Sequence, residues 1–261
     1  MTLFPTNTII LSDLLEVSKN AGKAIMEIYE TNFEVKLKRD NSPVTEADML
    51  SHEIICNSLR KITPTIPIIS EESSDISFDM RSSWEKYWLI DPLDGTKEFI
   101  TKNGEFTVNI ALIEYSKPVL GVIHAPALNK TYWGSKELGS SYYQKNSQKE
   151  VEIKIRDFKD RDTLRIMISR SHPSEDLEKW LNNINKYKIV TMGSSLKLCA
   201  LAKGDADIYP RFGSTCEWDI AAGHAILKYA GGSVLTLEKK ELEYGKKESF
   251  INPYFIASGK Y

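Results

Sequence analysis

The sequence predicts a mixed α/β (α+β) fold made of two intimately packed halves. Residues 1–156 combine helical periodicity with strand patterns separated by short turns, which is typical of helices packed on a largely antiparallel sheet. Residues 157–261 alternate short strands with helices, which indicates an α/β layer. The length of 261 residues allows a sizeable core, so we expect the two halves to form one unit.

The first half begins with two predicted helices. Apolar residues recur at helical spacing from Ser12 to about Glu30, with Ser12 as the N-cap. A second helix follows Thr45, whose spacing to Asp48 resembles a capping box. Asp48 can therefore satisfy a helix N-terminus, serve a functional site, or do both. Strands are expected at 65–70, 87–90, 106–114, 118–124, 131–133, 141–143 and 151–155, with a mobile polar loop at 73–83.

The second half is predicted from shorter segments. Strands are expected at 164–168, 187–192, 206–210, 233–235 and 255–257. Helices are expected at about 174–184, from Gly193 to about Lys203, and from Thr215 to Tyr229. The last of these is apolar nearly all round, which indicates a buried helix.

Charge and cysteine usage exclude several classes of protein. The formal net charge of −2 provides no basic field for nucleic acid. The N-terminus lacks the pattern of a signal peptide, and no apolar run is long enough to cross a membrane. Three scattered cysteines favour a reducing cytoplasm, and four histidines without metal spacing argue against a zinc enzyme.

The most informative stretch is residues 87–99, where an apolar strand ends in Asp91-Pro92-Leu93-Asp94-Gly95-Thr96. Buried carboxylates need counter-charges, and a stiff Pro turn allows both to point at one ion. Oxygen ligands of this kind suit Mg²⁺ rather than Zn²⁺. A helix beginning near Thr96 would direct backbone N–H groups toward a phosphate. The alternative is an ordinary surface turn, since Asp, Pro and Gly all favour turns.

Two further acids follow or begin predicted elements. Glu71 follows the strand at 65–70, and Asp219 lies at the start of the buried helix. Asp219 can be a metal ligand, or it can simply cap that helix. If the acids reach one cleft, Mg²⁺ ions about 4 Å apart could clamp a phosphate there, and Thr96 paired with Asp48 could accept a proton from water. The chemistry indicated is phosphoester hydrolysis by in-line attack, without a covalent enzyme intermediate.

Three stretches in order resemble the signature set of the inositol monophosphatase superfamily: residues 70–73 (SEES), 88–96 (WLIDPLDGT) and 217–223 (EWDIAAG). The resemblance covers nearly the whole chain. It implies a layered αβαβα sandwich and a Mg²⁺-dependent, lithium-sensitive phosphatase. By this resemblance the metal ligands would be Glu71, Asp91, Asp94, Asp219 and the backbone carbonyl of Leu93. Gly95 and Thr96 would hold the phosphate, Asp48 with Thr96 would orient the attacking water, and Glu71, Leu93, Asp94 and Asp219 would also border the substrate.

Further stretches resemble the CysQ-type 3′(2′),5′-bisphosphate nucleotidases within that superfamily. They are residues 97–100 (KEFI), 103–110 (NGEFTVNI), 169–172 (SRSH), 193–197 (GSSLK) and 209–211 (YPR). A bisphosphate substrate needs a second, cationic cradle for the phosphate that is not cleaved. Lys197 and Arg211 could supply charge, Ser194 and Ser195 could donate from a helix N-terminus, and His172 could contact a base or sugar. The alternatives are a solvated lysine, a structural ion pair for the arginine, and a turn role for His172.

The leading functional hypothesis is hydrolysis of the 3′-phosphate of 3′-phosphoadenosine 5′-phosphate to AMP and phosphate, a step connected with sulfur metabolism. Inositol monophosphatase or fructose bisphosphatase activity is the alternative within enzymes, and a non-catalytic nucleotide-binding protein is the alternative outside them. The resemblance implies Mg²⁺ as cofactor and a cytoplasmic monomer or homodimer, with peripheral association with the inner membrane known among relatives. No nucleic-acid partner and no transmembrane segment are expected.

Overall fold

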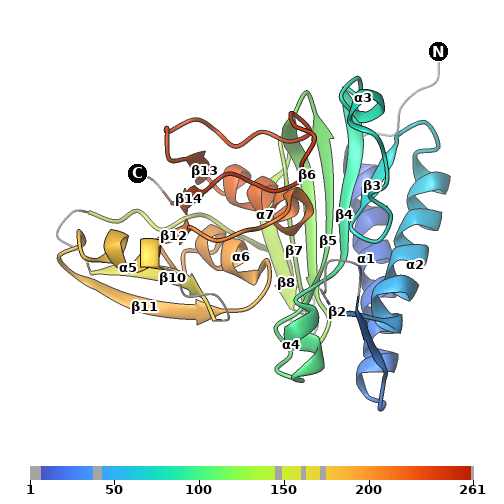
Figure 1. The fold of residues 1–261 in the computed structure, drawn as a ribbon, viewed down its shortest axis with the longest axis horizontal. Helices are drawn as coiled ribbons and strands as arrows, with labels where there is room; N and C mark the ends of the chain where they lie inside the picture. Colours follow the sequence, from blue (N-terminus) through green and yellow to red (C-terminus); the bar gives the residue numbers. More distant parts are fainter. Residues whose placement is uncertain (1–6, 38–42, 145–148, 160–162, 171–174, 260–261) are drawn as a thin grey trace.

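The computed structural model describes residues 7–37, 43–144, 149–159, 163–170 and 175–259, which form five stacked layers (Figure 1). Helices α1 and α2 cover one face of a seven-stranded sheet. Helices α6 and α7 lie between that sheet and a second, five-stranded sheet, whose outer face carries α5. The mixed α/β class and the αβαβα layering are therefore confirmed.

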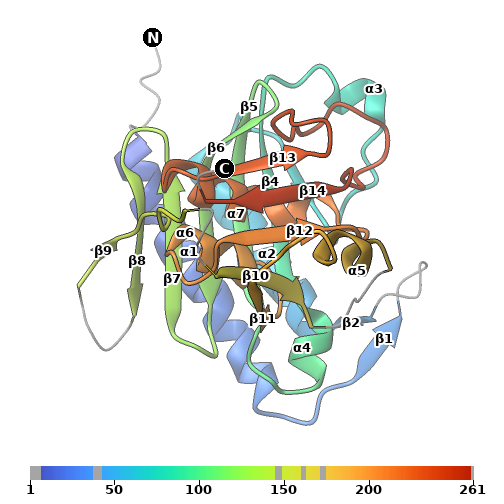
Figure 2. The ribbon, with the colours of Figure 1, turned by 90° about the vertical axis from the view of Figure 1, so that its left-hand side faces the viewer.

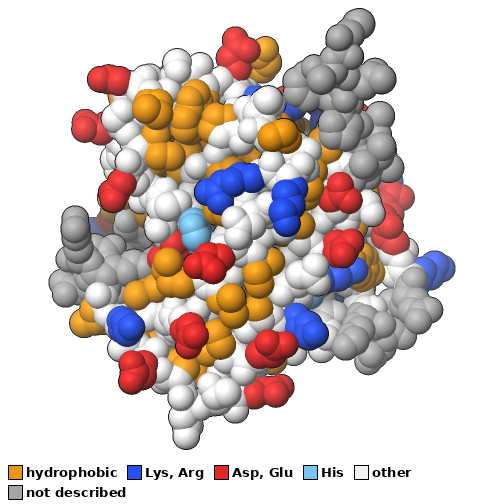
Figure 3. All heavy atoms as spheres, turned by 90° about the vertical axis from the view of Figure 1, so that its right-hand side faces the viewer, with side chains coloured by type: hydrophobic (Ala, Val, Ile, Leu, Met, Phe, Trp, Pro, Cys, Tyr) orange, Lys and Arg blue, Asp and Glu red, His pale blue; other side chains and the backbone are white. Residues whose placement is uncertain are grey.

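The outer helical layer consists of α1 (Asn7–Tyr29) and α2 (Glu46–Ile62). Leu14 and Ile25 of α1 and Ile55 of α2 are fully buried against the sheet. A small antiparallel ribbon of β1 (Val35–Leu37) and β2 (Pro43–Thr45) leads into α2. The outward face of this layer carries charges of both signs among small apolar patches (Figure 3).

The seven-stranded sheet has the strand order β3-β4-β5-β6-β7-β8-β9 within the described residues. Its strands are β3 (Ile68–Ser70), β4 (Lys86–Asp94), β5 (Thr107–Glu114), β6 (Lys117–Ala125), β7 (Lys130–Ser135), β8 (Gly139–Gln144) and β9 (Val151–Glu152). The pair β3–β4 is parallel, and the other pairs are antiparallel. The sheet is therefore largely antiparallel, as predicted.

Both faces of this sheet are buried, and β4 shows why its sequence is a continuous apolar run. Trp88 and Ile90 face α1 and α2, whereas Tyr87 and Leu89 face the α6–α7 layer. The pairing of β4 with β5 shifts register between Asp91 and Asp94, which marks a β-bulge. Pro92 lies in this bulge, where the ladder is interrupted and a missing N–H costs little.

The middle layer contains α7 (Glu217–Tyr229) and α6 (Leu196–Ala202). Helix α7 is buried on almost every side and lies directly on β6 and β7. Gly121 makes this approach feasible, because a Cβ atom there would lie 2.4 Å from the carbonyl oxygen of Ala222. The predicted buried helix is therefore present, and it starts at Glu217 rather than at Thr215.

The second sheet has the order β11-β10-β12-β14-β13 in the described part of the chain (Figure 2). Its strands are β10 (Leu164–Ser169), β11 (Tyr187–Met192), β12 (Ile208–Arg211), β13 (Ser233–Thr236) and β14 (Phe255–Ser258). Met167 of β10 faces the middle layer, whereas Ile166 faces outward against Leu177 of α5 (Glu175–Leu181). This strand-and-helix alternation matches the predicted α/β layer.

Two short helices complete the description. Helix α3 (Phe78–Arg81) lies in the segment predicted as a mobile loop, and Ser77 caps it by accepting a hydrogen bond from the N–H of Met80. That prediction was wrong for these residues, because Ser77 provides a local N-cap. Helix α4 (Thr96–Ile100) begins where the sequence predicted a helix. None of the described helices is long and apolar enough to cross a bilayer.

Candidate active site

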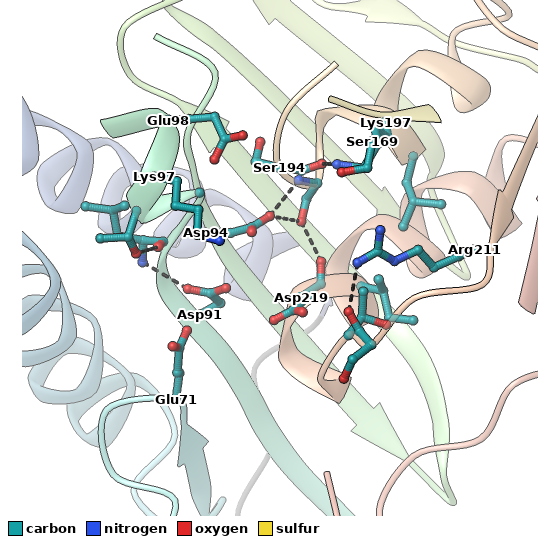
Figure 4. A pocket seen from close by; sticks show the side chains of 18 of the residues that line it. Glu71, Asp91, Asp94, Lys97, Glu98, Ser169, Ser194, Lys197, Arg211 and Asp219 are labelled. Atoms are coloured by element: carbon teal, nitrogen blue, oxygen red, sulfur yellow. Dashed lines mark hydrogen bonds between the residues drawn. The ribbon is translucent and has the colours of Figure 1, made fainter. Parts of the chain in front are cut away.

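A pocket of about 300 Å³ opens where the bulged end of β4 meets the α6–α7 layer (Figure 4). The lining comes from both halves of the chain. It includes these residues predicted for the site: Glu71, Asp91, Leu93, Asp94, Gly95, Thr96, Ser194, Lys197, Arg211 and Asp219. Glu71, Asp91, Asp94 and Asp219 point toward one common space. Residues from separate elements thus converge on one cavity.

The bulge of β4 presents Asp91, Leu93 and Asp94. Asp91 is almost fully buried and accepts a hydrogen bond on Oδ1 from the N–H of Leu93, 3.1 Å away. Ser51 of α2 donates to the carbonyl of Pro92 over 2.7 Å and fastens the turn from behind. The alternative of a solvent-exposed surface turn is therefore excluded, because Asp91 and Leu93 are buried, Asp94 is half-buried, and the turn is bonded to α2.

Asp48 caps helix α2 and also lies near Thr96. Its Oδ2 accepts hydrogen bonds from the N–H and the hydroxyl of Thr45, each over 2.7 Å, which completes the capping box of α2. Its Oδ1 lies 3.4 Å from the hydroxyl of Thr96. The same hydroxyl lies 3.5 Å from the carbonyl oxygen of Leu93. The cap therefore orients the carboxylate that faces Thr96.

Asp219 also caps a helix while it faces the pocket. Its Oδ2 accepts a hydrogen bond from the N–H of Cys216 over 2.8 Å, at the start of α7. Glu71 follows β3, and its N–H donates to the carbonyl of Ile90 on β4. This bond brings the end of β3 alongside Asp91. For Asp219 the capping role and the pocket position coexist.

Ser195 ties the two halves together at Asp94, a role that the sequence did not reveal. Its N–H and its hydroxyl lie 2.6 and 2.7 Å from Oδ2 of Asp94. The same hydroxyl lies 2.5 Å from the carbonyl oxygen of Asp219, and Asn109 donates to it over 2.7 Å. The one available signal was Asn109 itself, a polar residue inside a buried strand.

The acids in the pocket raise one another's pKa values. Burial raises the pKa of Asp91 well above its usual range, and the negative charges of Glu71 and Asp94 raise it further. Burial and the charge of Asp94 likewise raise the pKa of Asp219. Burial also raises the pKa of Asp94, although Lys197 opposes this change. A divalent cation bound among these carboxylates would favour their ionised forms.

The donor set fits a hard cation, but its present arrangement is not a closed metal cage. The groups facing the pocket are carboxylate and carbonyl oxygens, which suit Mg²⁺ or a similar ion. Among the described residues, no three acidic, His or Cys side chains are grouped closely enough to hold one ion together. One oxygen of Asp94 and one of Asp219 already accept hydrogen bonds. The predicted metal ligands therefore remain a prediction.

The opposite wall of the pocket is cationic. Lys197 is buried, and its Nζ donates to the carbonyl of Ser194 over 2.5 Å. Burial lowers the pKa of Lys197, although the nearby Asp94 opposes this change. Arg211 is also buried, and its guanidinium donates to the carbonyl of Ser214. Neither side chain is solvated at the surface, so that alternative for Lys197 is wrong.

Three residues predicted to contact the substrate, Ser194, Ser195 and His172, differ in outcome. Helix α6 begins at Leu196 rather than at Gly193, and the N–H of Ser195 is bound to Asp94. Ser195 is therefore not available as the phosphate donor that the sequence suggested. Ser194 does line the pocket. His172 lies outside the described residues.

Comparison with known proteins identifies the family. The model of the inositol monophosphatase family matches residues 10–258. A protein of Escherichia coli strain K12 named 3′(2′),5′-bisphosphate nucleotidase CysQ is 44% identical over 251 residues, which cover 95% of this chain and 99% of the relative. The chain belongs to the inositol monophosphatase family.

Other relatives agree with this family assignment. A protein of the same name from Salmonella typhimurium is 46% identical over 248 residues, 94% of this chain and 98% of the relative. The crystal structure of CysQ from Bacteroides thetaiotaomicron, described as a bacterial member of the inositol monophosphatase family, superposes with a TM-score of 0.85 at 35% identity. That match covers 98% of this chain and 99% of the other. Enzymes of the inositol monophosphatase family are generally metal-dependent.

Proposed function

We propose that this protein is a Mg²⁺-dependent 3′(2′),5′-bisphosphate nucleotidase that converts 3′-phosphoadenosine 5′-phosphate to AMP and phosphate. The observation that carries the proposal is the two-sided pocket, in which a wall of carboxylates faces a wall containing Lys197 and Arg211. A substrate with two phosphates needs both walls, one for cleavage and one for recognition. The relatives at 44–46% identity are named 3′(2′),5′-bisphosphate nucleotidases, which supports the same substrate class.

The carboxylate wall would hold the cofactor. We assign Glu71, Asp91, Asp94, Asp219 and the carbonyl of Leu93 to Mg²⁺, since these oxygens border one space and the neighbouring negative charges raise the pKa values of Asp91 and Asp219. When bound, the metal would acidify a water molecule and neutralise charge on the phosphate. All of these groups come from a single chain. We therefore propose that each monomer, whether alone or in a homodimer, carries a complete site.

The chain's own groups would position and deprotonate the attacking water. The Thr96 hydroxyl lies between Oδ1 of Asp48 and the carbonyl of Leu93, so it can accept from the water while it donates to Asp48. The water oxygen attacks phosphorus, the bond from phosphorus to the 3′ oxygen breaks, and the leaving oxygen takes a proton from solvent. The first turn of α4, from Gly95 and Thr96, would direct N–H groups toward the phosphate.

The cationic wall would hold the phosphate that is not cleaved. Lys197 and Arg211 are buried beside the pocket, so their charges act through a medium of low dielectric constant. We assign Ser194 and His172 to the same end of the substrate. The halves 1–156 and 157–261 would then form one catalytic unit. A role in cytoplasmic sulfur metabolism follows from the substrate proposed.

A substrate panel tests the proposal. Purified protein with Mg²⁺ should release phosphate from 3′-phosphoadenosine 5′-phosphate at least tenfold more efficiently than from inositol 1-phosphate or fructose 1,6-bisphosphate, and EDTA should abolish release. Asp94→Asn should lower turnover by a factor on the order of 10² or more. Glu114→Gln, which alters an ion pair with Lys86 far along β4 and β5, serves as the control.

Three outcomes would contradict this assignment. A preference for inositol 1-phosphate would favour the alternative activity within the same family. Full turnover by Asp94→Asn would remove the proposed metal role, and nucleotide binding without turnover by the wild type would indicate a binding protein.

A further inference from the structure

Glu105 joins three segments at the rim of the candidate site. It lies between α4 and β5, and its side chain retains only 20% of its exposure. Its Oε2 accepts a hydrogen bond from the N–H of Gly193 over 2.7 Å. Its Oε1 accepts one from Nη2 of Arg170, just beyond β10, over 3.0 Å. One carboxylate from the first half therefore contacts two segments of the second.

The turn that Glu105 holds is tightly packed and has an uncommon backbone conformation. A Cβ atom at Gly193 would lie 2.8 Å from Cγ of Glu98 and 3.0 Å from the carbonyl oxygen of Glu105. The next residue, Ser194, has a φ of 46°, in the left-handed region that non-glycine residues rarely adopt. Such a conformation persists when the surroundings fix it, and the bond to Glu105 is part of those surroundings.

This turn carries contacts to both walls of the pocket. Ser195 donates to Asp94 on the carboxylate wall, and the carbonyl of Ser194 accepts the hydrogen bond from Lys197 on the cationic wall. A displacement of the turn would therefore move Lys197 relative to Asp94. The separation of these two groups determines whether both phosphates of one substrate can be accommodated.

We propose that Glu105 is a positioning residue that sets the spacing between the two walls and thereby the preference for a bisphosphate substrate. The proposal rests on the function proposed above. Glu105 itself touches no phosphate in this scheme. Its effect passes through Gly193 to the Ser194–Lys197 contact, and Arg170 holds its other oxygen and so fixes its rotamer.

Matched substrates and variants distinguish a positioning role of Glu105 from a general role in stability. The substrates are 3′-phosphoadenosine 5′-phosphate and adenosine 3′-monophosphate, which lacks the second phosphate. Glu105→Ala removes both hydrogen bonds. Glu105→Gln retains a carbonyl acceptor for Gly193 and places an amide N–H₂ toward Arg170, so it breaks only that pair. Arg170→Gln breaks the same pair from the other side, and Glu114→Ala in β5 is the control for losing a distant surface ion pair.

We expect the variants to bind the substrate more weakly only when the substrate carries the second phosphate. Glu105→Ala should raise KM for the bisphosphate by about tenfold or more, consistent with two lost charge-assisted hydrogen bonds, one of them also an ion pair. Its KM for adenosine 3′-monophosphate should change by less than about threefold. Glu105→Gln and Arg170→Gln should show the same smaller rise in KM for the bisphosphate, and their effects should not add.

Binding of AMP, which retains only the 5′-phosphate, gives a readout without turnover. Calorimetry should show weaker AMP binding by Glu105→Ala than by the wild type, and unchanged binding by Glu114→Ala. Equal losses for both substrates together with a lower melting temperature would overturn the proposal, as would unchanged KM and AMP affinity. Failure of the wild type to hydrolyse the bisphosphate would instead refute the proposed function, so the two failures are distinguishable.

Discussion

Two buried histidines should make the stability of this protein fall in mild acid. His124 lies at the end of β6, where burial and then the charge of Lys19 lower its pKa from 6.5 to about 4. His224 lies inside α7, where burial lowers its pKa from 6.5 to about 3. Each ring therefore stays neutral in the folded state at a pH where the unfolded chain binds a proton.

The direction and the size of the change in the free energy of unfolding follow from this difference in proton binding. Because both folded-state pKa values lie below the unfolded value, the unfolded chain gains protons first, and stability falls as pH drops from about 6.5 toward 4. Between pH 7.5 and pH 5, each histidine should lower the free energy of unfolding by about 2 kcal/mol, and the two together by about 4 kcal/mol. Above pH 7 neither histidine should make the free energy of unfolding depend on pH.

Urea unfolding at several pH values, carried out on the wild type, the two single variants and the double variant, measures how much each histidine contributes. His124→Gln and His224→Gln preserve a polar group for Thr131 and for Tyr244, which are 2.9 Å from the respective rings. The pocket carboxylates titrate in the opposite sense, because their folded-state pKa values are raised. The test is therefore the difference in pH slope between the wild type and each variant, with the double variant showing the sum. Parallel curves for the wild type and the double variant would refute the reasoning.

Three other predictions concern packing and the pocket. Gly121→Ala should lower the free energy of unfolding by about 3 kcal/mol, because its Cβ would meet backbone atoms of Ala222, whereas Gly213→Ala should change it by less than about 1 kcal/mol. Asp207→Asn should cost about 3 kcal/mol in urea unfolding, because two arginines contact this buried carboxylate; a cost near zero would contradict this. Ser195→Ala should raise the Mg²⁺ concentration needed for half-maximal activity several-fold, since it removes the hydroxyl donor that orients Asp94 and lowers its pKa; an unchanged Mg²⁺ titration would contradict this.

The parts of the site that could be predicted from sequence depend on neighbouring residues. Thr45 and Asp48 are three positions apart, so the capping box could be expected from local geometry alone, and it is present. The apolar run ending in two aspartates likewise located the bulged end of β4. The burial of helix α7 followed from an apolar pattern on all faces, although the helix starts two residues later than predicted.

The parts that could not be predicted depend on contacts between distant segments. Ser195 and Asp94 are separated by 101 positions, and Gly193 and Glu105 by 88. No periodic pattern links such pairs, because their meeting depends on how the two sheets stack. The same contacts explain why the predicted helix start at Gly193 was wrong, since Ser194 adopts a left-handed conformation and Ser195 donates its N–H to Asp94.

The bulge in β4 limits which sequence changes are tolerated between Asp91 and Asp94. Positions three apart on a regular strand point to opposite faces of a sheet. Here Asp91 pairs with Asn109 and Asp94 with Thr107, and those partners are two apart, so both aspartates emerge on the same side. The extra residue in the bulge therefore compensates for the odd spacing of the two aspartates. Substitution at Pro92 or Leu93 leaves this count intact. Deletion of either residue would leave the two aspartates two positions apart, so both would stay on one side only if the bulge gave way to a regular strand; with the bulge retained, one carboxylate would turn toward the opposite core. Chain length at this point is therefore as much a determinant of the site as the acids themselves.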